Sequence, residues 1–244
     1  MRKFGLVGRN ISYSFSRKFF SEKFSTEGID ATYENFDLQD ISEFPEVIKT
    51  NPELAGLNVT IPYKQAIFPF LDELDPIAEE IGAVNTIKVG ADAKLTGFNT
   101  DYFGFSQALL PHLKSRHKKA LVLGTGGASK AVVYALKTLG ISSQFVSRSA
   151  SKKAISYTDL DTDVMEEHLL LINCTPLGTF PNNSEYPDIP IQNIGKNHLV
   201  FDLIYNPPVT KLLELAKTNG ATILNGREML EFQAEKAWEI WNSR

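Results

Sequence analysis

The second half of the chain alternates short, unbroken apolar runs with stretches of helical periodicity. The run at 120–123 (ALVL) precedes a helical pattern over 128–140, and further strand-like segments occupy 143–147, 169–174 and 198–205. Unbroken apolar runs of this length are typical of strands covered on both faces, as in a parallel sheet. The pattern therefore predicts an α/β domain built on a parallel sheet in this half of the chain.

The first hundred residues predict a second α/β region with a less regular order of elements. Strands are expected at 4–8, 32–37 and 55–59, followed by a hairpin over 85–98. Shorter strands are expected at 155–160 and 221–226. Helices are expected at 17–26, 41–50, from about Pro62, and at 76–81, 102–113, 210–218 and 227–241. The last of these has the apolar spacing of an amphipathic helix that packs onto a core.

Composition narrows the class of protein. With 244 residues, of which 43% are hydrophobic, the chain has room for one large domain or two small ones. A net charge of −4 without a dense basic stripe argues against a nucleic-acid surface. A single cysteine, Cys174, excludes an internal disulfide and fits a reducing compartment. No membrane span or signal peptide is expected, and the four histidines lack metal-ligand spacing. The simplest class is a soluble cytoplasmic enzyme without a metal.

A glycine turn follows the first apolar run of the second half. Gly124, Gly126 and Gly127 come directly after it and open the helical stretch. Glycines at a strand-to-helix turn let the backbone approach a ligand, and the new helix favours an anion such as a pyrophosphate. The third position of the usual GxGxxG is Ser129, so the match is incomplete and an ordinary turn is the alternative.

The segment after the run at 143–147 indicates which dinucleotide would bind. Ser147, Arg148, Ser149 and Lys152 lie where an NAD site usually carries an acid. A guanidinium can fork onto a 2′-phosphate and hydroxyls can donate to it, whereas a carboxylate would repel it. NADP is therefore favoured over NAD, with a solvated basic loop as the alternative.

Several polar residues of the first hundred suit a small hydroxylated ligand. Ser14 and Ser16 would point the same way in an extended chain, although either could instead cap the following helix. Asn58 and Thr60 lie at the carboxyl end of an expected strand, where open α/β sheets bind ligands. Lys64 would fall in the first turn of a helix, an unfavourable place for a cation unless it has a function.

Asp101 precedes the helix expected over 102–113. By itself, an acid in this place is most simply an N-cap or a first-turn acid.

Short motifs carry a resemblance that covers the whole chain. They are SYSFS, NVTIPYK, AVNT, GFNTD, GTGGASK, NCTPLG, DLIYNP and GREMLEFQ, in this order. These motifs, NVTIPYK above all, resemble those of the shikimate dehydrogenase family. The resemblance implies two α/β domains, an N-terminal substrate domain and a Rossmann-like NADP-binding domain, with the active site in the cleft between them. The substrate domain would comprise 1–100, completed by 227–244, and the NADP domain 101–226.

The resemblance also implies roles for individual residues. Lys64 and Asp101 would form the catalytic pair that serves proton transfer during reversible reduction of 3-dehydroshikimate by NADPH, in aromatic amino-acid biosynthesis. The shikimate site would be lined by Ser14, Ser16, Asn58, Thr60, Asn85, Tyr205 and Gln233. NADP would be held by Gly124, Thr125, Gly126, Gly127, Ala128, Ser147, Arg148, Ser149 and Lys152, with Leu203 and Gly226 near the nicotinamide. No metal is expected, and the chain would act as a monomer or homodimer.

The chain departs from the family's pattern at three places. Asn10 replaces the usual proline of GxPIxxSxS, Phe20 and Ser21 replace a His-Asn pair, and Ser147 replaces an asparagine. Two alternatives stay open at this point. One is a quinate/shikimate dehydrogenase of broader substrate and cofactor use. The other is a non-catalytic NADP- or metabolite-sensing protein on the same fold, which would be free to lose Lys64 or Asp101.

Overall fold

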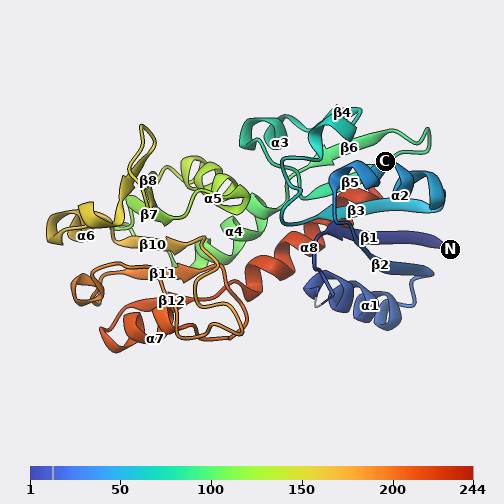
Figure 1. Ribbon diagram of the computed structural model, residues 1–244. Coiled ribbons are helices and arrows are strands. Elements are labelled where there is room, and N and C mark those ends of the chain that lie inside the picture. Colours follow the sequence, from blue (N-terminus) through green and yellow to red (C-terminus); the bar gives the residue numbers. More distant parts are fainter. Residues whose placement is uncertain (13, 244) are drawn as a thin grey trace. The chain divides into compact units, whose positions relative to one another are not determined.

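The computed structural model describes residues 1–12 and 14–243, and the chain divides into two compact units. The first comprises Met1–Thr100 with Gln233–Arg244, and the second comprises Asp101–Phe232. Each unit contains its own six-stranded sheet, and Figure 1 labels all of their strands except β9. Helix α8, Arg227–Asn242, begins in the second unit and ends in the first.

The sheet of the first unit is mixed. Its strands are β1 (Arg2–Gly8), β2 (Ala31–Asp37), β3 (Leu54–Val59), β4 (Glu73–Leu74), β5 (Thr86–Val89) and β6 (Leu95–Phe98). They lie in the order β2-β1-β3-β5-β6-β4, in which β5 and β6 form the expected antiparallel hairpin. The helices of this unit are α1 (Phe15–Glu27), α2 (Phe44–Thr50) and α3 (Pro76–Ile81), with short 3-10 turns at Ile41–Glu43 and Phe68–Phe70.

Two apolar clusters fill the first unit, and strand alternation divides residues between them. Strand β3 contributes Leu57 and Val59 to one cluster, while Gly56 faces the other, where Trp241 of α8 lies against it. The second cluster is strongly aromatic and joins Phe4, Phe20, Phe24, Tyr33 and Trp241. Trp241 also donates a hydrogen bond from Nε1 to the Ile87 carbonyl at 3.0 Å. The end of α8 is therefore part of this core.

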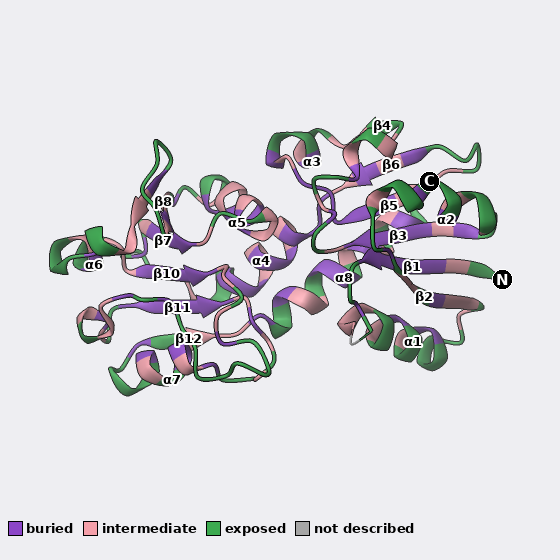
Figure 2. Cartoon of the chain, in the orientation of Figure 1, coloured by how far each residue is buried: buried purple, intermediate pink, exposed green. Residues whose placement is uncertain are grey.

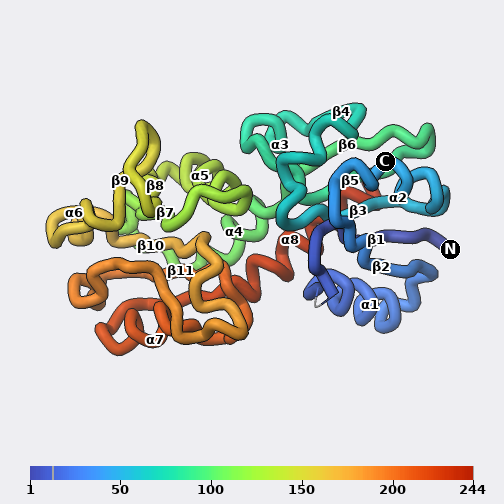
Figure 3. The backbone as a smooth tube through the Cα atoms, viewed as in Figure 1, coloured from blue at the N-terminus to red at the C-terminus, as the bar shows by residue number. Residues whose placement is uncertain are grey.

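The sheet of the second unit is entirely parallel, as the apolar runs predict. Its strands are β7 (Lys119–Leu123), β8 (Ser142–Ser147), β9 (Ala154–Ser156), β10 (Leu170–Asn173), β11 (Leu199–Asp202) and β12 (Thr222–Leu224). They lie in the order β12-β11-β10-β7-β8-β9, which is the strand order of dinucleotide-binding sheets. Figure 3 traces the crossovers between them.

Helices cover both faces of this sheet. They are α4 (Asp101–Leu109), α5 (Gly127–Thr138), α6 (Thr162–Glu167) and α7 (Lys211–Thr218), with 3-10 turns at Leu110–His112, Tyr157–Asp159 and Ile191–Asn193. Ala120 and Val122 of β7 pack with α4 and α5, whereas Leu121 and Leu123 pack with α6 and α7. Figure 2 shows the resulting buried strands. A strand covered on both faces explains why β7 is a continuous apolar run.

The helix predicted from Pro62 is wrong. Residues 61–67 form turns, because two helical hydrogen bonds are lost. The Lys64 carbonyl accepts from Val84 N at 2.7 Å, so the segment that precedes β5 occupies it. Pro69 has no N–H to donate to Gln65. Lys64 therefore does not lie at a helix N-terminus. An unfavourable position beside a helix dipole is thus no reason to assign it a function.

Two smaller expectations are also corrected. Helix α1 begins at Phe15, so Ser16 is helical and the extended pairing of Ser14 with Ser16 is wrong. Ser14 is instead the N-cap, accepting from Arg17 N at 3.3 Å. The strand expected at 155–160 is only the short β9, followed by a 3-10 turn capped by Ser156. Among the described residues, no helix is long and apolar enough to cross a membrane.

Candidate functional site

The glycine turn has the geometry of a nucleotide cradle. Gly124 follows β7 with φ at +98°, and a Cβ there would lie 3.2 Å from Thr175 Cγ2, so the turn requires glycine. Gly126 is the N-cap of α5 and has no atom within 4 Å of a Cβ position, which leaves open space in front of the helix. Ser129 is fully buried and donates to the Gly126 carbonyl at 2.7 Å. A small side chain thus fills the place of the third glycine.

The carboxyl ends of β7 and β10 lie at the switch point of the sheet, where parallel α/β folds bind ligands. A buried polar network organises this edge. The Asn173 amide nitrogen donates to Asp202 at 3.0 Å, and the Asn173 oxygen accepts from both the N–H and the hydroxyl of Thr175. The Thr210 hydroxyl donates to Asp202 at 2.6 Å. One carboxylate therefore joins the loops after β10 and β11.

Asn173 and Asp202 have no role among the predictions, although the sequence contains a signal for one. Each ends an otherwise apolar strand, and both are fully buried. Burial raises the pKa of Asp202 to about 6, while its hydrogen-bond donors oppose that shift. Burial also raises the pKa of the neighbouring Cys174 thiol, which favours its protonated, less nucleophilic form.

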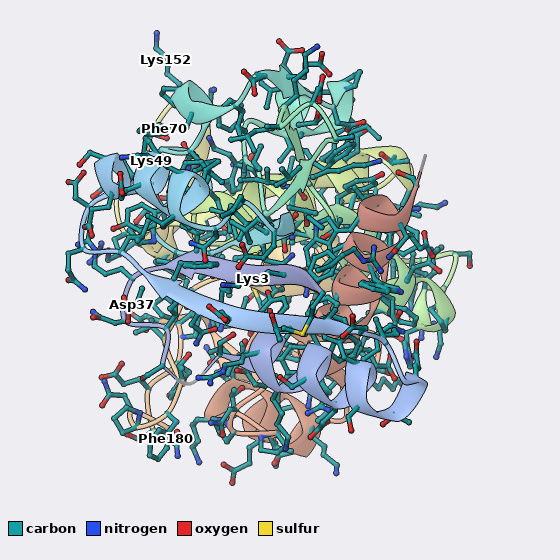
Figure 4. The ribbon with its side chains drawn as sticks, turned by 90° about the vertical axis from the view of Figure 1, so that its right-hand side faces the viewer. Lys3, Asp37, Lys49, Phe70, Lys152 and Phe180 are labelled. Atoms are coloured by element: carbon teal, nitrogen blue, oxygen red, sulfur yellow. The ribbon has the colours of Figure 1, made fainter. Side chains whose placement is uncertain are left out.

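The basic loop after β8 is exposed. Arg148, Ser149 and Lys152 all face solvent, and Figure 4 shows Lys152 extending away from the chain. The Ser147 hydroxyl donates to the Ser149 carbonyl, which folds the loop back on itself. Burial raises the pKa of Tyr157, and the positive charge of Arg148 acts against that rise. Arg148, which follows β8, is thus close enough to Tyr157 for its charge to act on the phenol.

Leu203 and Gly226, both predicted to lie near a nicotinamide, are brought together. A Cβ on Gly226 would lie 1.9 Å from the Leu203 carbonyl oxygen, so no side chain fits there. The Gly226 N–H donates to the Ile204 carbonyl at 3.1 Å. This backbone contact fixes the loop after β11 against the start of α8.

The first unit holds a buried network of neutral polar groups around Asn85. The Asn85 oxygen accepts from Thr100 N at 2.6 Å and from the Thr86 hydroxyl at 3.1 Å. Its nitrogen donates to the Thr100 hydroxyl at 3.0 Å and to Gln233 at 3.3 Å. Asn58 joins from β3, donating to the Asn85 carbonyl at 3.3 Å. The structure therefore brings Asn58, Asn85 and Gln233 together from β3, the start of the hairpin and α8.

Other predicted residues surround the ends of β1 and β3. Thr60 N donates to the Val7 carbonyl at 2.9 Å, and a Cβ on Gly8 would lie 2.5 Å from Thr60 Cγ2. The loop after β1 explains one departure from the family pattern. Asn10 has φ at +56° and donates its N–H to Asp37 at 2.8 Å, and a proline could do neither.

The remaining predicted residues belong to the second unit. Asp101 is the first residue of α4 and is 5% exposed, which is the first-turn placement expected for an acid. Tyr205 lies half-buried in the loop after β11. Within 1–12 and 14–243, no group of three histidine, cysteine, aspartate or glutamate side chains could hold a metal ion.

Comparisons with known proteins agree with the motifs. Residues 6–87 match the family model described as the shikimate dehydrogenase substrate binding domain. A shikimate dehydrogenase (NADP(+)) from Clostridium botulinum is 39% identical, over 97% of this chain and 95% of its own length.

Two solved structures are also similar. The shikimate 5-dehydrogenase of Thermus thermophilus, in complex with NADP(H) and shikimate, is 30% identical with a TM-score of 0.88, over 99% of this chain and 94% of that one. The quinate dehydrogenase of Corynebacterium glutamicum, in complex with NAD, is 27% identical with a TM-score of 0.87, over 99% and 93%. On the full-length identity to the Clostridium enzyme, this chain belongs to the shikimate dehydrogenase family.

Proposed function

We propose that this chain is an NADP-dependent shikimate dehydrogenase, which reversibly reduces 3-dehydroshikimate to shikimate in aromatic amino-acid biosynthesis. The observation that carries the proposal is the 39% identity, over 97% of the chain, to an enzyme of that name. Lys64 and Asp101 are both present in the motifs that bear the resemblance. A non-catalytic relative would be free to lose either one.

Neutral hydrogen-bonding groups suit the substrate. Ser14, Ser16, Asn58, Thr60, Asn85 and Gln233 offer donors and acceptors for ring hydroxyls and a carboxylate, and Tyr205 adds a phenol. The network around Asn85 fixes the direction of each amide before substrate arrives. Such preorganisation lowers the free-energy cost of ordering side chains on binding.

Lys64 and Asp101 are proposed as the catalytic pair. The Lys64 ammonium stabilises the alkoxide that develops on the ketone oxygen and supplies its proton. Asp101 balances that charge and orients the ammonium. Bound NADPH would supply the hydride, and the protein supplies orientation and electrostatics.

The cofactor site is proposed at the open end of the parallel sheet. The open space at Gly126 and the twelve-residue helix α5 fit a pyrophosphate. Thr125, Gly127 and Ala128 continue the cradle, while Ser147, Arg148, Ser149 and Lys152 suit a 2′-phosphate. Leu203 and Gly226 would flank the nicotinamide. Residues 1–100 with 227–244 would form the substrate domain and 101–226 the NADP domain. We further propose a cytoplasmic monomer or homodimer.

Nicotinamide reduction with shikimate and with quinate, each against NADP and NAD, tests the proposal. Activity confined to shikimate with NADP is the expected result. Comparable quinate turnover, or NAD use equal to NADP, would move the chain to the broader quinate/shikimate group. Cofactor binding without any turnover would overturn the enzymatic assignment.

A further inference from the structure

Tyr33 of β2 is a buried side chain that the motifs leave without a role. It is 5% exposed, and its hydroxyl donates to Asn58 Oδ1 at 2.7 Å. Asn58 is 3% exposed on β3, with β1 between the two strands. This bond is shorter than the two that the Asn58 nitrogen makes, at 3.3 Å to the Asn85 carbonyl and 3.4 Å to the Thr86 hydroxyl. Tyr33 therefore makes the strongest contact that orients the Asn58 amide.

The Tyr33 phenol is in its protonated form. Burial raises the pKa of Tyr33, and a hydrogen bond from Ser16 works against that rise. The phenol accordingly keeps its proton at physiological pH and remains a donor to Asn58. The contact with Asn58 is therefore that of a neutral phenol donating to an amide oxygen.

The ring of Tyr33 is held by aromatic neighbours. Phe20 stacks on it with centroids 4.8 Å apart and an interplanar angle of 13°, and Phe20 is fully buried. Trp241 lies 6.5 Å away at 44°. Phe20 stands where the family usually has a histidine. In this chain that replacement gives Tyr33 a flat apolar support.

We infer that Tyr33 is a positioning residue for substrate binding, which sets the direction of the Asn58 amide. The inference deepens the proposed function and rests on it. Removing the Tyr33 hydroxyl leaves Asn58 Oδ1 buried without its donor, so the amide no longer has one fixed orientation. Loss of the hydroxyl should lower the affinity for shikimate and leave the affinity for NADP unchanged.

The test compares two variants that make the same chemical change. Tyr33→Phe should raise KM for shikimate about five- to tenfold, the usual worth of one hydrogen bond, with KM for NADP unchanged and kcat within about twofold. Tyr63→Phe is the matched control, because Tyr63 is 3% exposed and its hydroxyl donates to the Leu38 carbonyl at 2.7 Å. The control should lose thermal stability by a similar amount and keep the wild-type KM for shikimate.

The outcomes separate this inference from the proposed function. Wild-type turnover of shikimate with NADP is measured first, and its absence would overturn the proposed function. With that turnover established, an equal KM for shikimate in Tyr33→Phe and wild type would overturn the inference alone. A rise in KM shared equally by Tyr63→Phe would also overturn it, because the effect would then follow from general destabilisation. If Tyr33→Phe folds poorly, shikimate titration into folded protein at low temperature gives the same comparison.

Discussion

The two units differ in how their candidate residues are held. In the first unit the proposed substrate amides are buried and bonded to one another, with the Asn85 side chain bonded to Thr86, Thr100 and Gln233. In the second unit the proposed 2′-phosphate ligands, Arg148 and Lys152, are exposed on a loop. A small hydroxylated ligand needs fixed directional partners, whereas a phosphate charge attracts flexible cations over a longer range. Substitution of a buried amide in the first unit should therefore affect stability and binding together, and substitution of an exposed cation in the second unit should affect binding alone.

Substitution of Lys64 should have the largest effect on activity. It tests whether a residue of the first unit can lose its function while the protein keeps its stability. Lys64→Ala should lower kcat on the order of 10²- to 10⁴-fold, because it removes the proton donor to the developing alkoxide. Its backbone bond to Val84 persists in the variant, so circular dichroism and the melting temperature should stay close to wild type. Unchanged turnover would refute the catalytic assignment.

Asp202 is a buried carboxylate of the second unit, unlike the exposed Arg148 and Lys152. Its substitution tests how its burial affects stability. Its folded pKa of about 6 lies above the 3.8 of an ordinary aspartate, so the folded state binds more protons between these values. The contribution of Asp202 to stability should thus be largest near pH 4 and fall as pH rises to about 6, by at most about 3 kcal/mol. Asp202→Asn removes this dependence. Denaturant unfolding of both proteins from pH 4 to 7 measures it, and a constant difference between them would contradict it.

Substitution of Arg148 tests whether an exposed residue of the second unit affects binding alone. Arg148→Ala should weaken NADP binding by about 1.5–3 kcal/mol, or ten- to a hundredfold, because the charge-assisted bonds to the 2′-phosphate are lost. NAD binding should barely change, and the melting temperature should not move. Fluorescence titration with both cofactors checks this, with Lys196→Ala as an exposed control in the same unit. Equal losses for NADP and NAD would remove Arg148 from the 2′-phosphate site.

Substitution of Asn85 tests whether a buried amide of the first unit affects stability and binding together. Asn85→Ala leaves the Thr100 N–H buried without its acceptor, which should lower the free energy of unfolding by about 1–3 kcal/mol. Shikimate affinity should fall as well, while NADP affinity stays constant. If stability is unchanged and only binding falls, the contrast between the two units is wrong.

Much of the fold could be predicted from the chain alone, and the reasons lie in particular residues. Strand β7 is a run of apolar residues because both of its faces are covered. Such a short apolar run could therefore be identified as a strand of a parallel sheet. The helix expected at Pro62 failed because the competitor for its hydrogen bond, Val84, is twenty residues from Lys64 in sequence. Local propensity contains no information about such a partner.

The candidate site was predictable only in part. Lys64 could be named from a motif that resembles those of a family, and Arg148 from its place after the second strand of the nucleotide domain. Tyr33 could not, because its meeting with Asn58 depends on the register of two strands on either side of β1. Asp202 and Thr210 likewise meet only after the loop between them folds back. Polar residues that end apolar strands are therefore candidates for such buried networks in related sequences.

Helix α8 has a consequence for synthesis of the protein on the ribosome. The first unit needs residues from Gln233 onward, since Ala234, Ala237 and Trp241 belong to its aromatic core. The 132 residues of Asp101–Phe232 are translated in between. At ordinary elongation rates of about 5–20 residues per second, this takes roughly 7–26 s. The unit that is made first is therefore completed last, and its nascent chain must wait for the C-terminal helix while the second unit, continuous in sequence, already folds.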